Sequence, residues 1–528
     1  MWEHVPGIVP YLRRQASERY DRFEAIRKKY DPNGMFMNAT FAGVLEKTIR
    51  RINNNTSLAP TPKKSKGIRA FFRSILKPSA KDAAWTNWAK NQSCNPTEIF
   101  HPKTLQDLTS IILKAKATGK KIRCAGSGHS WSSSSVTDGY LVDVNGMQQI
   151  HTPVYDGVQK TWTVTVETGV TVKDLDDALK KHDPPLALPS NVVLDSVRYG
   201  GILSLGCHGA ATNTRTLPDL VTEVTIIDAD GNLNTFSEAK NSEEFAAATI
   251  NLGLLGIIYT YTLRVEPMFK LHMTDRYPLL SDYFSNPEQD GPKIKAMVLG
   301  NDQTEIFYWP FNTPGLEAAN DRIWIKQWRR TTNPVSISPE CEAFKKLIQA
   351  AVGGKDSDEV LEAPDAIHYQ AGVENIPSLD LEMAFKVNED FSNVVVAWNY
   401  VIDQLFEYAN RGGFPFNLTL EMRFVKSSAM LMSPAYDTDP EAIYCMIEVL
   451  SVVNTPGFEE FSSKVAKFWM DNFHARPHWA KLWEYVPGIV PHLRRQASER
   501  YNRFEAIRKK YDPKGMFMNA TFASLLGH

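Results

Sequence analysis

The stretch Ala125-Gly126-Ser127-Gly128-His129-Ser130-Trp131 decides how this chain is interpreted. Before it, Thr104 and Asp107 predict a capped amphipathic helix that ends at Gly119, and residues 121–124 predict a short strand. Glycines directly after a strand let backbone N–H groups turn inward and hold an anion, typically a phosphate. A histidine inside such a loop would lie beside whatever the loop binds.

Taken alone, this loop could also be a Gly/Ser turn with a solvated histidine. A P-loop is excluded because no Gly-Lys-Ser/Thr follows, and the spacing is not that of a Rossmann fingerprint. Two further glycine-rich stretches follow, at residues 196–209 (SVRYGGILSLGCHG) and 251–257 (NLGLLGI). Three such stretches indicate one extended cofactor that the backbone approaches closely in several places.

With the late motif His-Ala-Arg-Pro-His-Trp-Ala-Lys at residues 474–481, these stretches resemble the sugar-1,4-lactone oxidases of the vanillyl-alcohol-oxidase flavoprotein superfamily. The resemblance covers roughly residues 85–528. It implies an α+β fold: a PCMH-type FAD-binding domain, a mixed α/β substrate (cap) domain, and a C-terminal tail that returns to the FAD domain. The implied FAD-binding residues are Ala125, Gly126, Ser127, Gly128, His129, Ser130, Gly200, Gly201, Ser204, Gly206, His208, Gly209, Gly256 and Ile257. It also implies a covalent bond from His129 to the flavin.

Residues 417–425 alternate strictly between polar and apolar side chains, so Asn417, Thr419, Glu421 and Arg423 would share one face of a strand. Its polar face could meet solvent, which is the commoner outcome for such a face. The resemblance instead implies that Glu421 and Arg423 line the substrate cavity and that Lys481 lies near the flavin ring. Neighbouring opposite charges are expected to keep Glu421 and Arg423 ionised. Arg198 stands near a position where the related polyol oxidases carry a serine, which weakens a polyol assignment.

The resemblance implies that C2 of a sugar-1,4-lactone, of the D-arabinono or L-gulono type, gives a hydride to flavin N5. Dioxygen would then reoxidise the flavin, with hydrogen peroxide and an ascorbate-like compound as products. Two alternatives stay open: an alditol or carbohydrate oxidase, and a lactone dehydrogenase that uses a protein electron acceptor. A third is of another class, a non-catalytic flavin-binding or membrane-tethered protein.

The composition is that of an ordinary globular protein. The chain has 528 residues, 43% hydrophobic and 23% charged, and its formal net charge of −1 gives no argument for nucleic-acid binding. The five cysteines form no C-x-x-C pair, which favours a reducing compartment. Histidines and cysteines do not fall at zinc-ligand spacing, so we expect no metal. No signal peptide or membrane span is predicted, and we expect an intracellular protein.

The ends of the chain carry an unusual repeat, because residues 2–43 nearly duplicate residues 483–524 with five differences. We interpret residues 1–47 as the product of a gene fusion or a gene-model artefact, with a functional duplicate as the alternative. Residues 48–84 are predicted to be a basic linker, with seven Lys or Arg and no acid between Lys63 and Lys81. Such a linker could be solvated, or could attach the protein to an anionic mitochondrial or endoplasmic-reticulum membrane. The remaining expected parts are the FAD-binding domain (85–267), the cap domain (268–470) and the C-terminal segment (471–528).

Overall fold

The computed structural model describes residues 85–313, 317–336, 354–369 and 377–528. The expectations for residues 1–47 and for the basic linker, including membrane attachment through it, therefore lie outside the described residues. Within these ranges, no helix combines the length and the apolar character needed to cross a membrane.

A small parallel sheet leads into the glycine-rich loop. Its order is β3 (Glu98–Phe100), β5 (Tyr140–Asp143) and β4 (Ile122–Ala125). Helix α4 (Leu105–Thr118) precedes β4, and both halves of the capping box at Thr104 and Asp107 are present. Gly119 ends the helix at φ 64°, a left-handed conformation that glycine adopts without steric cost. The local signals around the loop are thus confirmed. A short hairpin, β1 (Trp85–Thr86) with β2 (Ser93–Cys94), precedes this sheet.

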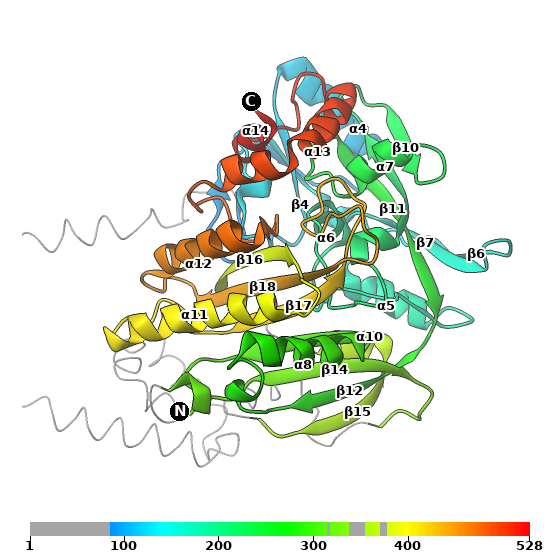
Figure 1. Cartoon of the computed structure of the whole chain (residues 1–528). Coiled ribbons are helices and arrows are strands. Elements are labelled where there is room, and N and C mark those ends of the chain that lie inside the picture. Colours follow the sequence, from blue (N-terminus) through cyan, green and yellow to red (C-terminus); the bar gives the residue numbers. More distant parts are fainter. Residues whose placement is uncertain (1–84, 314–316, 337–353, 370–376) are drawn as a thin grey trace, which may run out of the picture. The chain divides into compact units, whose positions relative to one another are not determined.

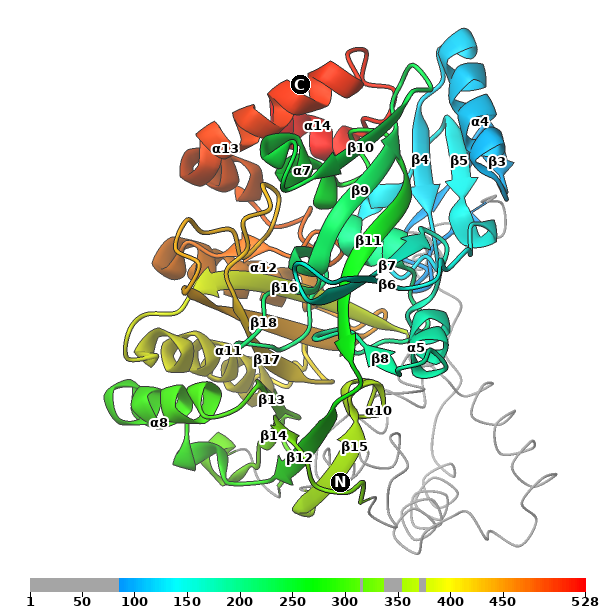
Figure 2. The same ribbon diagram turned by 90° about the vertical axis from the view of Figure 1, so that its right-hand side faces the viewer.

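Figure 2 shows a second, antiparallel sheet. Its order is β10 (Leu233–Ser237), β9 (Val221–Ile227), β11 (Ile257–Pro267), β7 (Thr161–Glu167) and β6 (Val154–Asp156), and β8 (Leu186–Ala187) pairs with the end of β11. The helices of this region are α5 (Val172–Lys180), α6 (Tyr199–Ser204) and α7 (Ser242–Thr249). The other two glycine-rich stretches lie in segments next to this sheet, at α6 and directly before β11. The expected burial of Val164 and Val166 on one face of β7 is confirmed, since both are fully buried.

The third sheet has eight strands, and every neighbouring pair in it is antiparallel. Its order is β15 (Ser357–Glu362), β12 (Lys270–Arg276), β14 (Trp324–Thr331), β13 (Gln303–Tyr308), β17 (Leu420–Lys426), β18 (Ile443–Val452), β16 (Ser378–Lys386) and β19 (Arg476–Pro477). Figure 1 shows α8 (Pro287–Leu299), α11 (Ser392–Asn410) and α12 (Phe458–Phe473) along one face of this sheet. The short helix α10 (Ala363–Ile367) follows β15.

The C-terminal tail returns to the part of the fold that carries the glycine-rich loop. It forms α13 (Ile489–Tyr511), which has a non-helical residue at Ala497 and ends at Asp512 as the following proline predicts, and then α14 (Ala520–Leu526). Buried Phe517 lies in the same apolar cluster as α4 and β5. The buried guanidinium of Arg123 donates a hydrogen bond of 2.7 Å to the carbonyl oxygen of Phe517. The tail is therefore part of that core.

Candidate active site

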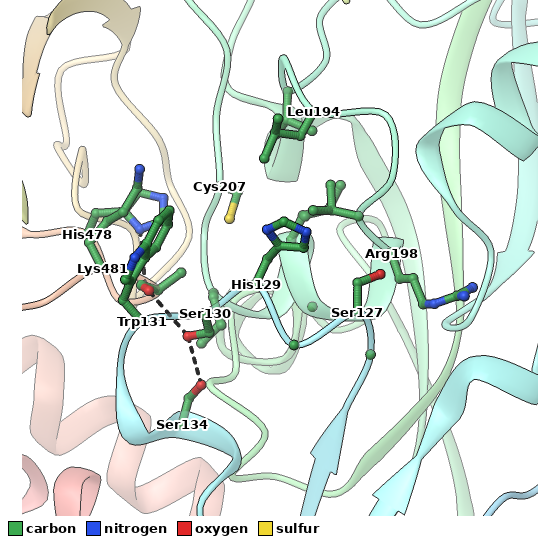
Figure 3. A pocket seen from close by; sticks show the side chains of 18 of the residues that line it. Ser127, His129, Ser130, Trp131, Ser134, Leu194, Arg198, Cys207, His478 and Lys481 are labelled. Atoms are coloured by element: carbon green, nitrogen blue, oxygen red, sulfur yellow. Dashed lines mark hydrogen bonds between the residues drawn. The ribbon is translucent and has the colours of Figure 1, made fainter. Parts of the chain in front are cut away.

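The sequence motifs line one cavity of about 330 Å³ (Figure 3). Its lining includes most of the predicted cofactor-binding residues, together with Glu421, Arg423 and Lys481. One wall comes from the glycine-rich segments of the first two sheets and the other from strands β16, β17 and β18. The cavity therefore has a backbone-rich wall and a charged wall.

Hydrogen bonds join the glycine-rich loop to the two other sequence motifs. The hydroxyl of Ser127 donates to the carbonyl oxygen of Ser196 at 2.9 Å, which joins the first glycine-rich stretch to the second. The backbone N–H of Trp131 donates to the carbonyl oxygen of Ala480 at 2.7 Å, which joins the loop to the late His-Trp-x-Lys motif. Gly128 has φ +70°, a conformation that L side chains rarely adopt. The loop thus needs its second glycine for its shape.

His129 is held as a neutral, largely buried imidazole in the cavity wall. Its ring stacks on Trp88 with the ring centroids 4.7 Å apart, and burial lowers its pKa to about 4. Its Nδ1 atom is buried and has no hydrogen-bond partner among the described residues. Figure 3 shows the ring and the thiol of Cys207 in the lining of the same cavity. A neutral imidazole with an unpaired nitrogen is a nucleophile near neutral pH.

The backbone-rich wall has room for a flat, extended cofactor. A Cβ atom built on Gly201 would meet no described atom within 4 Å, although Gly201 lines the cavity. By contrast, a Cβ on Gly200 would lie 2.7 Å from the Cβ of Thr168, so Gly200 is needed for close packing behind the wall. The free space at Gly201 and the unpaired His129 nitrogen fit a bound flavin, which would approach both.

Three of the predicted cofactor-binding residues do not line the cavity. Ile257 is 1% exposed in the apolar core, and the alternation of β11 turns Ile258 toward the cavity instead. Gly206 packs near Ile250, and a Cβ on Gly209 would lie 2.4 Å from the carbonyl oxygen of Asn191. Direct contact of these residues with the cofactor stays a prediction, which the cavity lining does not support. Gly209 allows close backbone packing behind the wall, whereas Gly206 adopts φ +69° beside the side chains of Ile250 and Pro434.

The alternating segment around Glu421 faces the cavity rather than solvent. Glu421 is 6% exposed and lines the cavity with Arg423, whereas Leu420, Met422 and Phe424 point to the opposite, apolar side and are fully buried. The solvent alternative for this face is thereby excluded. Arg198 also lines the cavity, but its side chain packs against Gly126 and its guanidinium donates to the carbonyl oxygen of Gly169. Figure 3 shows the side chain of Arg198 directed away from His129.

Two cations are bound among the carboxyl groups of the charged wall. The ammonium of Lys481 donates to Asp380 and, at 2.8 Å, to Glu448, and it lies 3.7 Å from Glu382. The guanidinium of Arg423 contacts three further carboxylate oxygens, those of Glu448, of Glu421 at 2.6 Å and of Glu305 at 3.2 Å. Burial opposes the charge on Lys481, but the carboxylates around it raise its pKa well above the ordinary value. The lysine therefore stays protonated.

The surroundings of Glu421 oppose its expected ionisation. Burial, and then the charge of Glu448 directly across the sheet, raise the pKa of Glu421 well above its ordinary value, and the contribution of Arg423 does not compensate. Glu448 has the opposite shift, because Lys481 and Arg423 overcome its burial and hold its pKa well below the ordinary value. Neighbouring carboxyl groups in one site are thus driven to different protonation states.

His208 and His478 complete the site from two different segments. The two nitrogens of His208 lie 2.9 Å from Glu382 and 2.8 Å from the carbonyl oxygen of Gly209. Nδ1 of His478 accepts a hydrogen bond from the N–H of Ala480, and burial lowers the pKa of His478 to about 3. Ligand atoms of His208, Glu382 and His478 lie within 4.8 Å of one another, a spacing that the sequence did not reveal. Because Lys481 also adjoins Glu382, we interpret this group as an ion-pair cluster.

Sequence reasoning missed Asp380, Glu382 and Glu448. A signal was available for the first two, because residues 378–386 alternate polar and apolar side chains as residues 417–425 do. Glu448 stands alone among apolar neighbours and gives no such pattern. Its position opposite Glu421 follows only from the pairing of β17 with β18.

Comparisons with known proteins agree with this geometry. A family model described as "FAD binding domain" matches residues 96–237, and a model of "D-arabinono-1,4-lactone oxidase" matches residues 381–525. An L-gulono-1,4-lactone dehydrogenase of Mycobacterium tuberculosis is 26% identical over 455 residues, covering 84% of this chain and 99% of that protein. An L-gulonolactone oxidase of Scyliorhinus torazame is 25% identical over 478 residues, covering 82% and 96%. A D-arabinono-1,4-lactone oxidase of Yarrowia lipolytica is 32% identical over 189 residues, covering 35% of each chain.

Among solved structures, the cholesterol oxidase of B. sterolicum has a TM-score of 0.68 with 19% identity, covering 89% of this chain and 100% of that one. This likeness concerns the fold. It confirms the expected α+β class, and the FAD-binding family model confirms FAD as the cofactor. With its cavity between a glycine-rich wall and a charged sheet, the chain is similar over most of its length to sugar-1,4-lactone oxidases and dehydrogenases, and it is an FAD-dependent oxidoreductase.

Proposed function

We propose that this protein oxidises the C2 hydroxyl of a sugar-1,4-lactone of the D-arabinono or L-gulono type, with dioxygen as the final electron acceptor. The observation that carries the proposal is the cavity itself, where the wall that fits a flavin faces buried Glu421, Arg423 and Lys481. The relatives named as lactone oxidases and dehydrogenases cover most of this chain and support the same substrate class.

FAD would supply the ring that accepts the hydride. We propose that the loop of residues 125–130 holds it with Gly200, Gly201, Ser204 and Gly256, and that His129 binds it covalently. The unpaired Nδ1 of His129 supports this attachment, because that nitrogen is neutral, buried in the wall and otherwise unused. Two glycines, Gly206 and Gly209, would support the loop from behind. His208 would lie on the side of the charged wall.

The charged wall would bind and orient the lactone. Arg423 and Lys481 are fixed by carboxylates on several sides, so their positions are held before a substrate arrives. Lys481 would stabilise negative charge that develops during the reaction. Glu421 would hydrogen-bond the reacting hydroxyl and take its proton once its own proton has left.

A lactone dehydrogenase with another electron acceptor is the second candidate, favoured by the name of the Mycobacterium tuberculosis relative. Both candidates share the same first half-reaction. They differ in whether dioxygen reaches the reduced enzyme.

The test begins with the visible spectrum of the purified protein before and after acid precipitation. Yellow colour in the pellet supports covalent attachment, and colour in the supernatant removes the covalent link only. D-arabinono-1,4-lactone and L-gulono-1,4-lactone are then added without oxygen. Bleaching of the flavin by either lactone supports the function, and a spectrum unchanged by both lactones contradicts it. Readmitted oxygen, compared with an artificial acceptor, distinguishes oxidase from dehydrogenase.

Variants connect the activity to the site. Glu421→Gln and Lys481→Met should lower turnover at least about tenfold while flavin content stays near the wild-type value. The exposed Lys514, changed to Met, is the matched control and should keep full turnover. Full turnover in both site variants would refute the assignment of these residues.

A further inference from the structure

Three glutamates form a straight row across the eight-stranded sheet. Glu448 on β18 lies directly opposite Glu382 on β16 and directly opposite Glu421 on β17. Residues that are directly opposite in an antiparallel sheet have Cβ atoms about 4.5–5.5 Å apart, and like charges at this spacing are destabilising. All three side chains are buried, between 2% and 6% exposed. The row therefore costs the fold stability unless protons or cations compensate it.

The cations near the row do not compensate every carboxyl group. Among the described residues, five carboxyl groups lie in this cluster. Facing them are the two permanent cations Arg423 and Lys481, and His208, bound to Glu382, is a third when it is protonated. The five are Glu305, Asp380, Glu382, Glu421 and Glu448. If all five were ionised, at least two negative charges would be left over in a buried cavity. An uncompensated buried charge costs several kcal/mol, so some of these groups must hold protons.

The contacts show which glutamate keeps its charge. Glu448 has one carboxylate oxygen on Arg423 and the other on Lys481, so both of its oxygens accept hydrogen bonds from cations. Glu421 has one contact with Arg423 and shares a side-chain hydrogen bond with Glu448. A hydrogen bond between two carboxyl groups needs one proton. Glu421 holds this proton, because two cations compensate the negative charge of Glu448 and only one contacts Glu421.

We propose that Glu421 and Glu448 act as a pair that shares one proton, and that the charge of Glu448 sets the pH at which Glu421 becomes a base. This rests on the proposed function, in which Glu421 takes the proton of the substrate hydroxyl. Glu448 touches neither substrate nor flavin in this proposal, and is a positioning residue that acts through Glu421. Two carboxyl groups sharing a site titrate in two widely separated steps.

The step is balanced in its protons. Above the higher of the two pKa values the pair has lost its shared proton to solvent, and Glu421 is a carboxylate. The O–H bond of the substrate hydroxyl then breaks and its proton bonds to Glu421, while the C–H electron pair leaves with the hydride for the FAD. The pair is thereby returned to its one-proton state. Activity should rise with pH through the higher pKa of the pair.

Other titratable and charged groups face the pair and stay in place in the test variants. They come from strands β13, β16 and β17 and from the segments that follow α6, α10 and β19. The groups are Glu305, Asp380, Glu382, Arg423, His208, Tyr369, His478 and Lys481. Since these groups are common to all variants, removal of the Glu448 charge alone should move the titration of Glu421.

The experiment compares the pH dependence of kcat in the full-length holoenzyme and in Glu448→Gln. Loss of the opposing charge should move the acid limb of the profile to lower pH by about one pH unit or more. Glu448→Asp keeps the charge and should stay near the wild-type profile. Glu441→Gln is the matched control, because Glu441 is an exposed carboxylate that pairs with Lys426 at the end of β17. An acid limb that stays in place in Glu448→Gln, or that moves to higher pH, overturns the proposal.

An infrared titration gives a second readout that does not depend on turnover. The C=O stretching band of a protonated carboxyl group that disappears in Glu421→Gln is assigned to Glu421 and followed with pH. The proposal expects this band to persist in the wild type well above the ordinary pKa of glutamate, and to be lost at lower pH in Glu448→Gln. Absence of the band in wild-type protein at pH 6 overturns the proposal even if Glu448→Gln does not fold. If no lactone reduces the flavin, the proposed function fails, and this titration alone decides about the shared proton.

Discussion

Replacement of Arg123 by methionine should detach the C-terminal tail from the loop that it supports. The guanidinium of Arg123 is buried and donates to four backbone carbonyl oxygens, those of Ser134 at 2.6 Å, Leu252 at 2.8 Å, Gly253 at 3.0 Å and Phe517 at 2.7 Å. These carbonyls belong to three separate segments of the chain. Burial lowers the pKa of Arg123 to about 10, so the side chain is still charged at neutral pH.

The magnitude follows from these contacts. Hydrogen bonds to a charged group contribute about 1.5–3 kcal/mol each, which gives a gross loss of about 6–12 kcal/mol for four bonds. Methionine also removes a buried charge, and the relief of its desolvation returns several kcal/mol. The net loss in the free energy of unfolding should be about 3–5 kcal/mol. Methionine fills most of the space, so the cavity left behind adds little.

Urea unfolding of the FAD-loaded protein, followed by tryptophan fluorescence, measures this loss. The control is Arg264→Met, which removes an exposed arginine from β11 and should change stability by less than about 0.5 kcal/mol. A loss below about 1 kcal/mol in Arg123→Met, with an unchanged denaturant slope, would show that the four carbonyls find other partners. The reasoning about the tail would then be refuted.

Three further predictions address the cofactor and the charged wall. Gly201→Ala should lower the FAD content, because the added Cβ would enter the free space of the cavity. Gly157→Ala is the control, because its Cβ also meets no described atom but lies outside the cavity lining, and it should keep its full FAD content. Flavin absorbance measures both. Burial and Glu448 oppose ionisation of Glu382, but His208 and Lys481 hold its pKa at about 2, below the ordinary 4.5. The ionised Glu382 therefore adds to the free energy of unfolding above pH 4.5, and this contribution is lost as the pH falls toward 2. In acid unfolding curves, the free energy of unfolding of Glu382→Gln should fall less steeply over this range than that of the wild type. His129→Ala should release all flavin into the supernatant on acid precipitation, and flavin that stays in the pellet would mean attachment at another residue.

Much of the fold follows from short-range signals in the sequence. The capping box at Thr104, the left-handed Gly119 and the alternation around Val164 each depend on residues within one element, and the structure confirms all three. The loop 125–131 is of the same kind, because its glycines and its position after a strand are local properties. The limit of such reasoning is seen at Ile257, where the motif was recognised but a shift of one residue decides which side chain faces the cavity.

The sequence by itself therefore predicted the elements around the glycine-rich loop and the glycine-rich wall, and the resemblance implied Glu421, Arg423 and Lys481 for the charged wall. Only the tertiary structure decided that Glu448 opposes Glu421, that Lys481 is surrounded by carboxylates and that burial beside Glu448 raises the pKa of Glu421. The physical reason is the range of the interactions. Caps and alternation act between neighbours in the chain, whereas the charge of a buried carboxyl group depends on strands that the fold pairs across long stretches of sequence.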